Sequence, residues 1–263
     1  MMKRIKRLLP TVIILLIFVN LCRAQYSEII QTSRPGQAFI PFSTGKSVFQ
    51  VQSGVTYSDF DNSDVDQEGS GTDFFTLLRY GLTEDFELRS TLGFNSSEVK
   101  FGDNTVSEAG GLSTWSVGIR YNIISGEGYK PSFGVQTDIN LNWVSEDFKS
   151  EDIAPIITLL HTQQLSETFA LTTNWSLSWN GNDNSTAGNY VLNISFPLSD
   201  KLGSFIENYG TLSNGSITHR WDTGLGYLIN NNLMLDCSAG YGKNDGLSDW
   251  FIDAGVSWRV KSK

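Results

Sequence analysis

The chain has 263 residues, of which 40% are hydrophobic and 12% aromatic, and its formal net charge at pH 7 is −9. A negative charge of this size argues against nucleic acid as a partner.

The first 24 residues have the three-part layout of a secretory signal peptide. Four basic residues between positions 3 and 7 precede an apolar stretch over 8–21, and the small residues Cys22 and Ala24 predict cleavage after Ala24. The apolar stretch is shorter than the about 20 residues of a membrane-spanning helix, which argues against a retained anchor. The leader carries five basic and no acidic residues, so the mature chain has a net charge of −14. Its remaining cysteine, Cys237, has no partner for a disulfide.

After residue 25, apolar and polar residues alternate with a period of two. In 115–123 (WSVGIRYNI), the odd positions are apolar and the even positions are Ser, Gly, Arg and Asn. Because a strand sends successive side chains to opposite faces, each such segment has one apolar and one polar face. The segment 153–165 is poorly phased, and 202–211 does not show which face is apolar. We predict twelve strands, over 47–58, 72–82, 86–95, 112–124, 132–144, 153–165, 169–180, 188–196, 202–211, 219–229, 233–242 and 250–260.

The links between these strands alternate in kind. Tight links such as TED (83–85) and SET (166–168) lie between two apolar residues, whereas the other links, such as 61–71 (DNSDVDQEGSG), are longer and acidic or glycine-rich. A transmembrane β-barrel has short periplasmic turns and longer extracellular loops. Aromatic residues near the strand ends of the apolar face favour this fold over an exported β-sandwich. We therefore predict an all-β fold, an antiparallel transmembrane barrel of about 12 strands over 47–263, preceded by a periplasmic N-terminal segment over 25–46.

Four stretches are similar to an outer-membrane family named for the MetA pathway of phenol degradation. They are 31–55, 74–89 (FFTLLRYGLTEDFELR), 201–210 (KLGSFIENYG) and 221–260, so the resemblance spans nearly the whole mature chain. The chain departs from the family at Ser33, where an acidic residue is common, and at its end, WRVKSK, where an aromatic residue commonly serves assembly. The resemblance implies a transporter in the outer membrane of a Gram-negative cell, with lipid, the barrel-assembly machinery and a small solute as partners.

Charged residues on the polar faces predict the candidate site inside the barrel. A barrel of twelve strands lies between the filled eight-stranded and the open sixteen-stranded kinds, so its lumen is narrow. Rings of charge orient solutes in pores, whereas buried pairs of opposite charge also serve as structural plugs, and both interpretations stay open. The predicted lumen charges are Arg79, Glu87, Arg89, Arg120, Asp138, Glu207, Asp222, Asp236, Asp253 and Arg259.

Three functions remain open from the sequence. The first is a passive channel for small solutes, hydrophobic or aromatic ones among them; the second is a closed structural or surface-interaction barrel; the third is an enzyme that acts on lipid. The chain has only two histidines, His161 and His219, and neither has a nucleophile or metal ligand at a typical spacing. No P-loop or dinucleotide motif is present, and the acidic link 61–68 lacks calcium-loop spacing. We expect no enzymatic activity, cofactor or metal.

Overall fold

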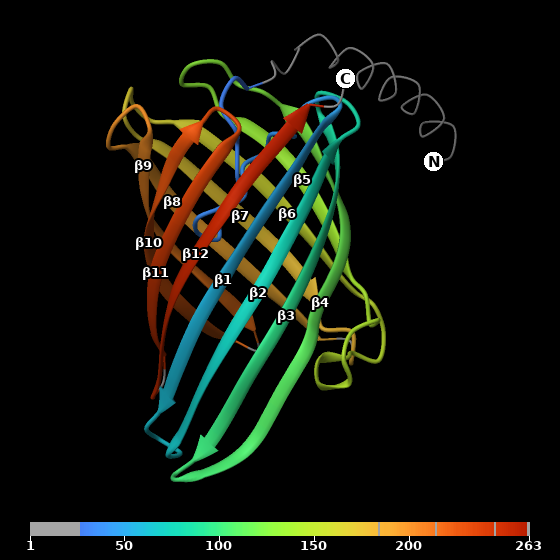
Figure 1. Cartoon of the computed structure of the whole chain (residues 1–263), viewed down its shortest axis with the longest axis vertical. Coiled ribbons are helices and arrows are strands. Elements are labelled where there is room, and N and C mark those ends of the chain that lie inside the picture. Colours follow the sequence, from blue (N-terminus) through green and yellow to red (C-terminus); the bar gives the residue numbers. More distant parts are fainter. Residues whose placement is uncertain (1–26, 184, 214, 245, 262–263) are drawn as a thin grey trace, which may run out of the picture.

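Twelve antiparallel strands close into one barrel (Figure 1), which confirms the predicted fold class. The computed structural model describes residues 27–183, 185–213, 215–244 and 246–261, so the predicted signal peptide lies outside the described part. The barrel closes because β1 pairs with both β2 and β12. The strands are β1 (Val48–Asn62), β2 (Gln67–Gly81), β3 (Phe86–Phe101), β4 (Asn104–Ile124), β5 (Ser132–Asn140), β6 (Ala154–Gln164), β7 (Ala170–Trp179), β8 (Thr186–Pro197), β9 (Leu202–Ser213), β10 (Ser216–Asn230), β11 (Leu233–Asn244) and β12 (Leu247–Lys261).

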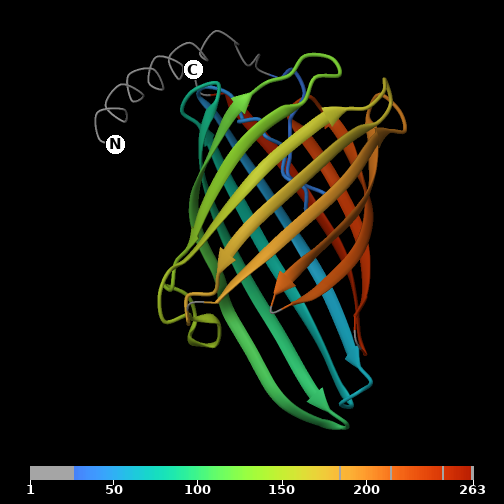
Figure 2. The ribbon, with the colours of Figure 1, turned by 180° about the vertical axis from the view of Figure 1, so that it is seen from behind.

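The barrel has two unlike ends. The turn end carries the short turns, the start of β1 and the end of β12, which pair as Val48 with Lys261. At the opposite, hairpin end, β1 to β4 extend well beyond the other strands (Figures 1 and 2). Within the described residues, no helix is long and apolar enough to cross a membrane.

The predicted links 61–71 and 96–111 are mostly strand rather than loop. They extend β1 to β4, which are 15 to 21 residues long. A hairpin that extends beyond the lipid needs no apolar outer face, so these residues lack the apolar alternation that marks a strand in lipid. Conversely, β5 stops at Asn140 instead of 144, and the link to β6 contains a 3-10 turn, Glu146–Phe148.

Three turns at the turn end repeat one local structure. In the first, Leu82 N donates to Phe86 O at 2.9 Å, and Thr83 Oγ1 accepts hydrogen bonds from the backbone N–H groups of Asp85 and Phe86. The turns that begin at Leu165 and Leu198 make the same bonds, with serine in place of threonine. The hydroxyl satisfies turn amides that have no ladder partner, which explains why Leu-Thr/Ser recurs along the sequence.

The predicted faces are confirmed. Outward side chains such as Trp175, Leu177 and Trp258 are 45 to 55% exposed, as expected where lipid covers them, whereas inward side chains such as Gln52 and Arg120 are fully buried. The barrel interior is therefore polar and the exterior apolar.

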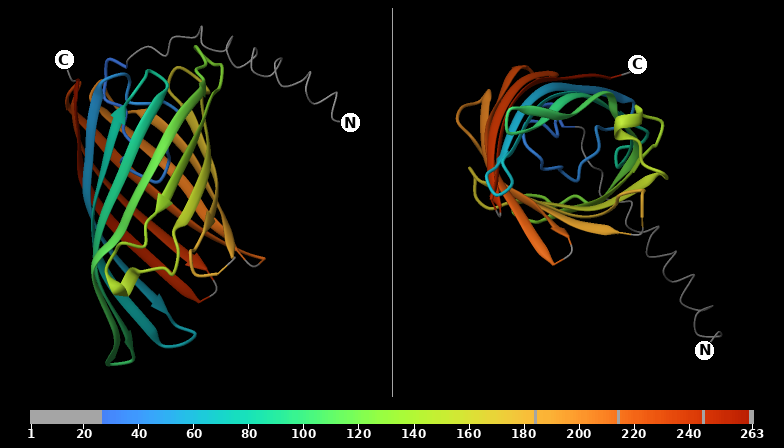
Figure 3. Two further views of the ribbon diagram at one scale, coloured as in Figure 1. Left: turned by 90° about the vertical axis from the view of Figure 1, so that its right-hand side faces the viewer. Right: turned by 90° about the horizontal axis from the view of Figure 1, so that it is seen from below.

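The N-terminal segment differs from its expected place. We expected 25–46 to be periplasmic, but residues 30–44 run inside the barrel before β1 begins (Figure 3). The segment has no periodic pattern in its sequence. Its polar and apolar residues contact the inner wall of the barrel and are not distributed as they would be in a segment surrounded by water.

Contacts with this segment explain why the sequence did not show the inward face of β6 and β9, predicted as 153–165 and 202–211. On β9, the inward Phe205 is buried, and its ring lies against Gly36, where an added Cβ would be 2.8 Å from Cε2. On β6, the inward Leu160 is 1% exposed and pairs with Gly134, which lies against Pro41 of the segment. Apolar residues therefore face the lumen where the segment covers them, which blurs the alternation.

Candidate functional site

The N-terminal segment follows the inner wall around the lumen, as the view along the barrel in Figure 3 shows. The backbone N–H of Ser33 donates to Gln52 on β1, that of Gln37 to Glu207 on β9, and that of Phe39 to Asn174 on β7. Asn174 also donates to Phe39 O at 2.8 Å, and Thr44 N donates to Glu87 on β3 at 3.0 Å. Because polar side chains of the wall satisfy backbone groups of the segment, it can lie in the lumen without a ladder of its own.

Arg34 is the tightest attachment of the segment. Its Nη2 lies 2.7 Å from Asp236 Oδ1 and also pairs with Asp253, and the side chains of all three residues are less than a tenth exposed. The guanidinium occupies a notch between Gly54 and Gly255, which are paired across β1 and β12; a Cβ on either glycine would lie 2.3 Å from an Arg34 nitrogen. We call Arg34, its two carboxylates and these two glycines the Arg34 latch.

A second cluster lies on β2, β3 and β4 near the turn end. Arg79 Nη2 pairs with Glu87 Oε2 at 2.8 Å, and Arg120 Nε lies 3.8 Å from Glu87 Oε1. Both arginines also donate to Phe42 O of the N-terminal segment. Arg79 and Glu87 flank the first tight turn on one face, whereas β4 brings Arg120 beside them, and the two arginines also hold the segment.

The same cluster continues toward β5. Arg89 Nε pairs with Asp138 Oδ1 at 2.9 Å, and Gln136 accepts from both Arg89 and Arg120. The guanidinium of Arg89 also lies 5.1 Å from the centre of the Phe39 ring, so the segment contacts this part of the cluster through an aromatic face.

Two carboxylates, Glu207 and Asp222, face each other on β9 and β10. Glu207 accepts hydrogen bonds from Gln37 N and Asn193 Nδ2, whereas neither oxygen of Asp222 has a hydrogen-bond partner among the described residues. This wall therefore carries two carboxylates that no basic side chain of the described residues joins in an ion pair, in contrast to the arginine-rich wall of β2 to β4.

The ten predicted lumen charges all lie on the inward face. Five gather around Glu87, two are joined by Arg34, two form the carboxylate pair on β9 and β10, and Arg259 lies at the turn end, where it donates to Asn232 Oδ1 at 2.9 Å. Sequence reasoning missed Arg34 as the partner of Asp236 and Asp253, although it lies in the first family-like stretch.

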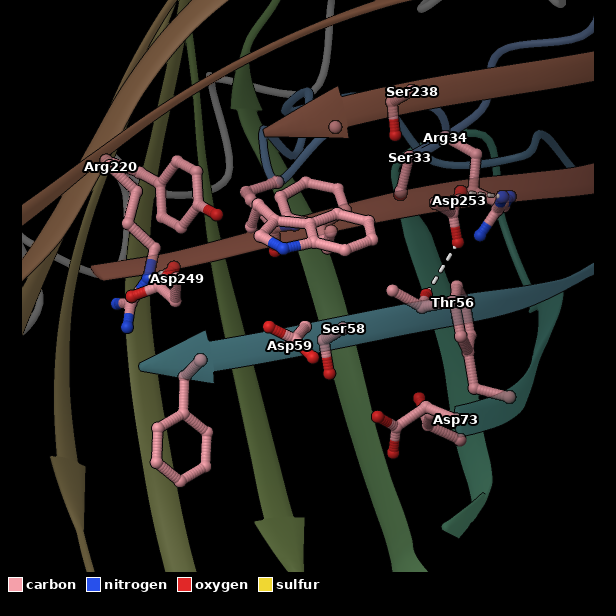
Figure 4. A pocket seen from close by; sticks show the side chains of 18 of the residues that line it. Ser33, Arg34, Thr56, Ser58, Asp59, Asp73, Arg220, Ser238, Asp249 and Asp253 are labelled. Carbon is pink, nitrogen blue, oxygen red and sulfur yellow. Dashed lines mark hydrogen bonds and ion pairs between the residues drawn. The ribbon is translucent and has the colours of Figure 1, made fainter. Parts of the chain in front are cut away.

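Two cavities flank the Arg34 latch. The hairpin-end cavity has a volume of about 820 Å³ and is shown in Figure 4; the turn-end cavity has a volume of about 560 Å³. Ser33 and Arg34 line both. The turn-end cavity is lined by apolar side chains such as Ile30, Phe205 and Met234 and by polar or charged ones such as Glu167, Thr172 and Asp200. The segment thus divides the lumen into two chambers that meet at the latch.

The two histidines lie on the outer face of the wall. His161 lies between Thr173, with Nδ1 3.3 Å from Oγ1, and the ring of Phe133. His219 is exposed on β10 and is bound through its backbone to Asn244. Across the residues with described positions, no three metal-ligating side chains are placed to hold a metal ion.

A closed antiparallel barrel with an apolar exterior and a charged interior is an outer-membrane β-barrel. Its family is also clear: a family model described as "Putative MetA-pathway of phenol degradation" matches residues 32–260, and the chain belongs to this family. No curated protein matches the chain.

Solved structures with a similar fold include outer-membrane channels and autotransporter domains. An outer membrane channel from Pseudomonas putida F1 has a TM-score of 0.63 at 11% identity, with 86% of this chain and 99% of that chain covered. The transport unit of the autotransporter AIDA-I from Escherichia coli has a TM-score of 0.56 at 12% identity, covering 94% and 97%. The NanC porin has a TM-score of 0.53 at 10% identity, covering 81% and 100%. At these identities the likeness shows the fold alone.

Proposed function

We propose that the protein is a passive channel through which small solutes cross the outer membrane, with the Arg34 latch as its narrowest point. The observation that carries this proposal is the pair of cavities, one at each end of the lumen, that share Ser33 and Arg34 as lining. Short turns face the periplasm in barrels of this kind, so the turn-end cavity would open to the periplasm and the hairpin-end cavity to the outside.

The walls of the two chambers suit small solutes with an apolar part. Phe39, Phe75 and Phe251 line the outer chamber beside charged groups, and Ile30 and Met234 line the inner one. A binding site of this kind combines apolar surface with a few polar groups that orient the solute.

The second candidate is a closed barrel with a structural role. One observation favours it: backbone groups of the N-terminal segment bond to wall residues on β1, β3, β7 and β9 and narrow the lumen. The two candidates differ in whether solute crosses the barrel. In a channel, solute passes beside the segment or when the segment is displaced, whereas in a closed barrel no solute passes.

Conductance of the refolded mature chain in planar bilayers tests the proposal. A channel gives discrete current steps, and liposomes that contain the protein swell in a solution of a small sugar but not of a large one. A barrel that conducts no ions and admits no sugar, although it migrates on gels as a folded, heat-modifiable protein, would support the structural candidate.

A further inference from the structure

The charges that line the hairpin-end cavity are unevenly compensated. Its three lining arginines, Arg34, Arg89 and Arg220, each pair with a carboxylate of the wall. Asp73 on β2 has no such partner: its carboxylate accepts a hydrogen bond from Asn95 Nδ2 at 2.9 Å, and no cationic side chain among the described residues lies within ion-pairing distance of it. Figure 4 shows Asp73 on a different part of the wall from Arg34 and Arg220. This carboxylate therefore faces the cavity with its charge unneutralised.

Other acceptors without partners occur in the same region of the wall. Asn95 Oδ1, next to Asp73, is buried and has no hydrogen-bond partner within the described chain. Asp249 Oδ2 is likewise buried without a hydrogen-bond partner within the described chain, while Oδ1 of the same side chain pairs with Arg220 Nε at 2.7 Å. These two oxygens are covered by the wall, but without donors opposite them they add partial negative charge beside the cavity, which favours a cation inside it.

Aromatic rings lie beside these acceptors. Phe75 is two residues from Asp73 on the same face of β2, and Phe60 and Phe251 line the cavity from β1 and β12. The ring of Phe75 already receives a cation, because the Arg34 guanidinium lies 4.9 Å from its centre. Aromatic faces attract ammonium groups as well as apolar surface, so carboxylate and rings together define one kind of ligand.

We propose that the hairpin-end cavity binds organic cations, with the ammonium group at Asp73 and the apolar body against the aromatic rings. This inference deepens the proposed channel function, on which it rests for its physiological meaning, by naming a class of solute. A neutral solute would leave the charge of Asp73 uncompensated, and an anion would be repelled by the unpaired carboxylate.

The approach to the cavity is negatively charged, like Asp73 inside it. Asp61, Asp66, Glu68 and Asp103 surround a hollow between the tips of the β1–β2 and β3–β4 hairpins. Acidic side chains at a mouth raise the local concentration of cations, within a screening length of about 8 Å at physiological ionic strength. Cations are thus attracted before they reach Asp73.

Calorimetric titration of the refolded full chain in detergent tests this inference with three probes of one shape. Phenethylammonium, 2-phenylethanol and 3-phenylpropionate share a benzene ring on a two-carbon chain and differ in charge. We expect the ammonium to bind about tenfold more tightly than the alcohol, because its hydrogen bonds to a carboxylate are charge-assisted, and the carboxylate probe to bind least. Equal affinity for the ammonium and the alcohol would overturn the inference.

Two substitutions in the cavity and one control substitution outside it locate the site. Asp73→Asn keeps the size of the side chain and should reduce the preference for the ammonium to about twofold or less, since only the charge is lost. Glu127→Gln removes one charge from an exposed position of the link between β4 and β5, at the opposite end of the barrel, and should leave the preference near that of the unaltered chain. Phe251→Leu should weaken all three probes together. A preference that survives Asp73→Asn contradicts the assignment.

The outcome is separable from that of the channel proposal. Binding that follows this pattern in a barrel that never conducts would retain the cation site and reject the channel. Conductance without any preference for the ammonium probe would retain the channel and reject the cation site.

Discussion

Replacement of Arg34 by alanine is the most direct perturbation of the lumen. Its guanidinium is buried, with Nε 3.1 Å and Nη2 2.7 Å from Asp236 Oδ1, and it also binds Asp253. Removing one partner of a buried ion pair costs about 3–5 kcal/mol, because the other charge stays buried without compensation. Arg34→Ala leaves two such carboxylates, so the arrangement with the segment in place should lose at least about 3 kcal/mol.

This loss of free energy should displace the N-terminal segment and should not unfold the barrel. The twelve-stranded ladder is unchanged, and Thr44 and Phe39 still attach the segment elsewhere. At about 1.4 kcal/mol per factor of ten, the population with the segment displaced from the latch should rise on the order of a hundredfold. Single-channel recording in planar bilayers should show openings more often, with a larger mean conductance.

Two comparison variants make the experiment decisive. Lys46→Ala removes a positive charge from an exposed position of the same segment and should behave as the unaltered chain. Arg34→Ala combined with Asp236→Asn and Asp253→Asn removes the buried negative charge and should recover stability while the latch stays absent. Openings as rare in Arg34→Ala as in Lys46→Ala would refute the idea that the latch holds the pathway closed.

Three further predictions follow from the wall and the turns. Gly255→Ala should increase the frequency of openings, as Arg34→Ala does, since its Cβ would lie 2.3 Å from Arg34. Gly188→Ala, whose Cβ would lie 3.7 Å from Leu212, should not change the current. Thr83→Ala should lower the free energy of unfolding in urea by about 1 kcal/mol, because two turn amides lose their acceptor, and Thr83→Ser should restore it. With Cys237 replaced by serine, a cysteine at Asp103 should react with an impermeant thiol reagent on whole cells and one at Asp200 should not; the reverse pattern would invert the barrel.

The sequence by itself determined the number of strands, the faces of most of them and the tight turns. Alternation such as that in 115–123 is a local property, because lipid outside and polar groups inside select every second residue. The Leu-Thr/Ser turns are equally local, since their hydrogen bonds join residues at most four apart, as between Leu82 and Phe86. Arg79, Glu87 and Arg89 could be placed together for the same reason, because they flank one such turn.

The course of the N-terminal segment was decided only by the tertiary structure. Residues 30–44 have no period, and their partners are remote: Asp236 and Asp253 are 202 and 219 positions from Arg34. Only a closed barrel brings β12 beside β1, with β11 as the next strand, and so creates the notch at Gly54 and Gly255. The segment pairs with no strand, so the side chains of the surrounding wall determine its course. That wall exists only once the last strand has paired with the first.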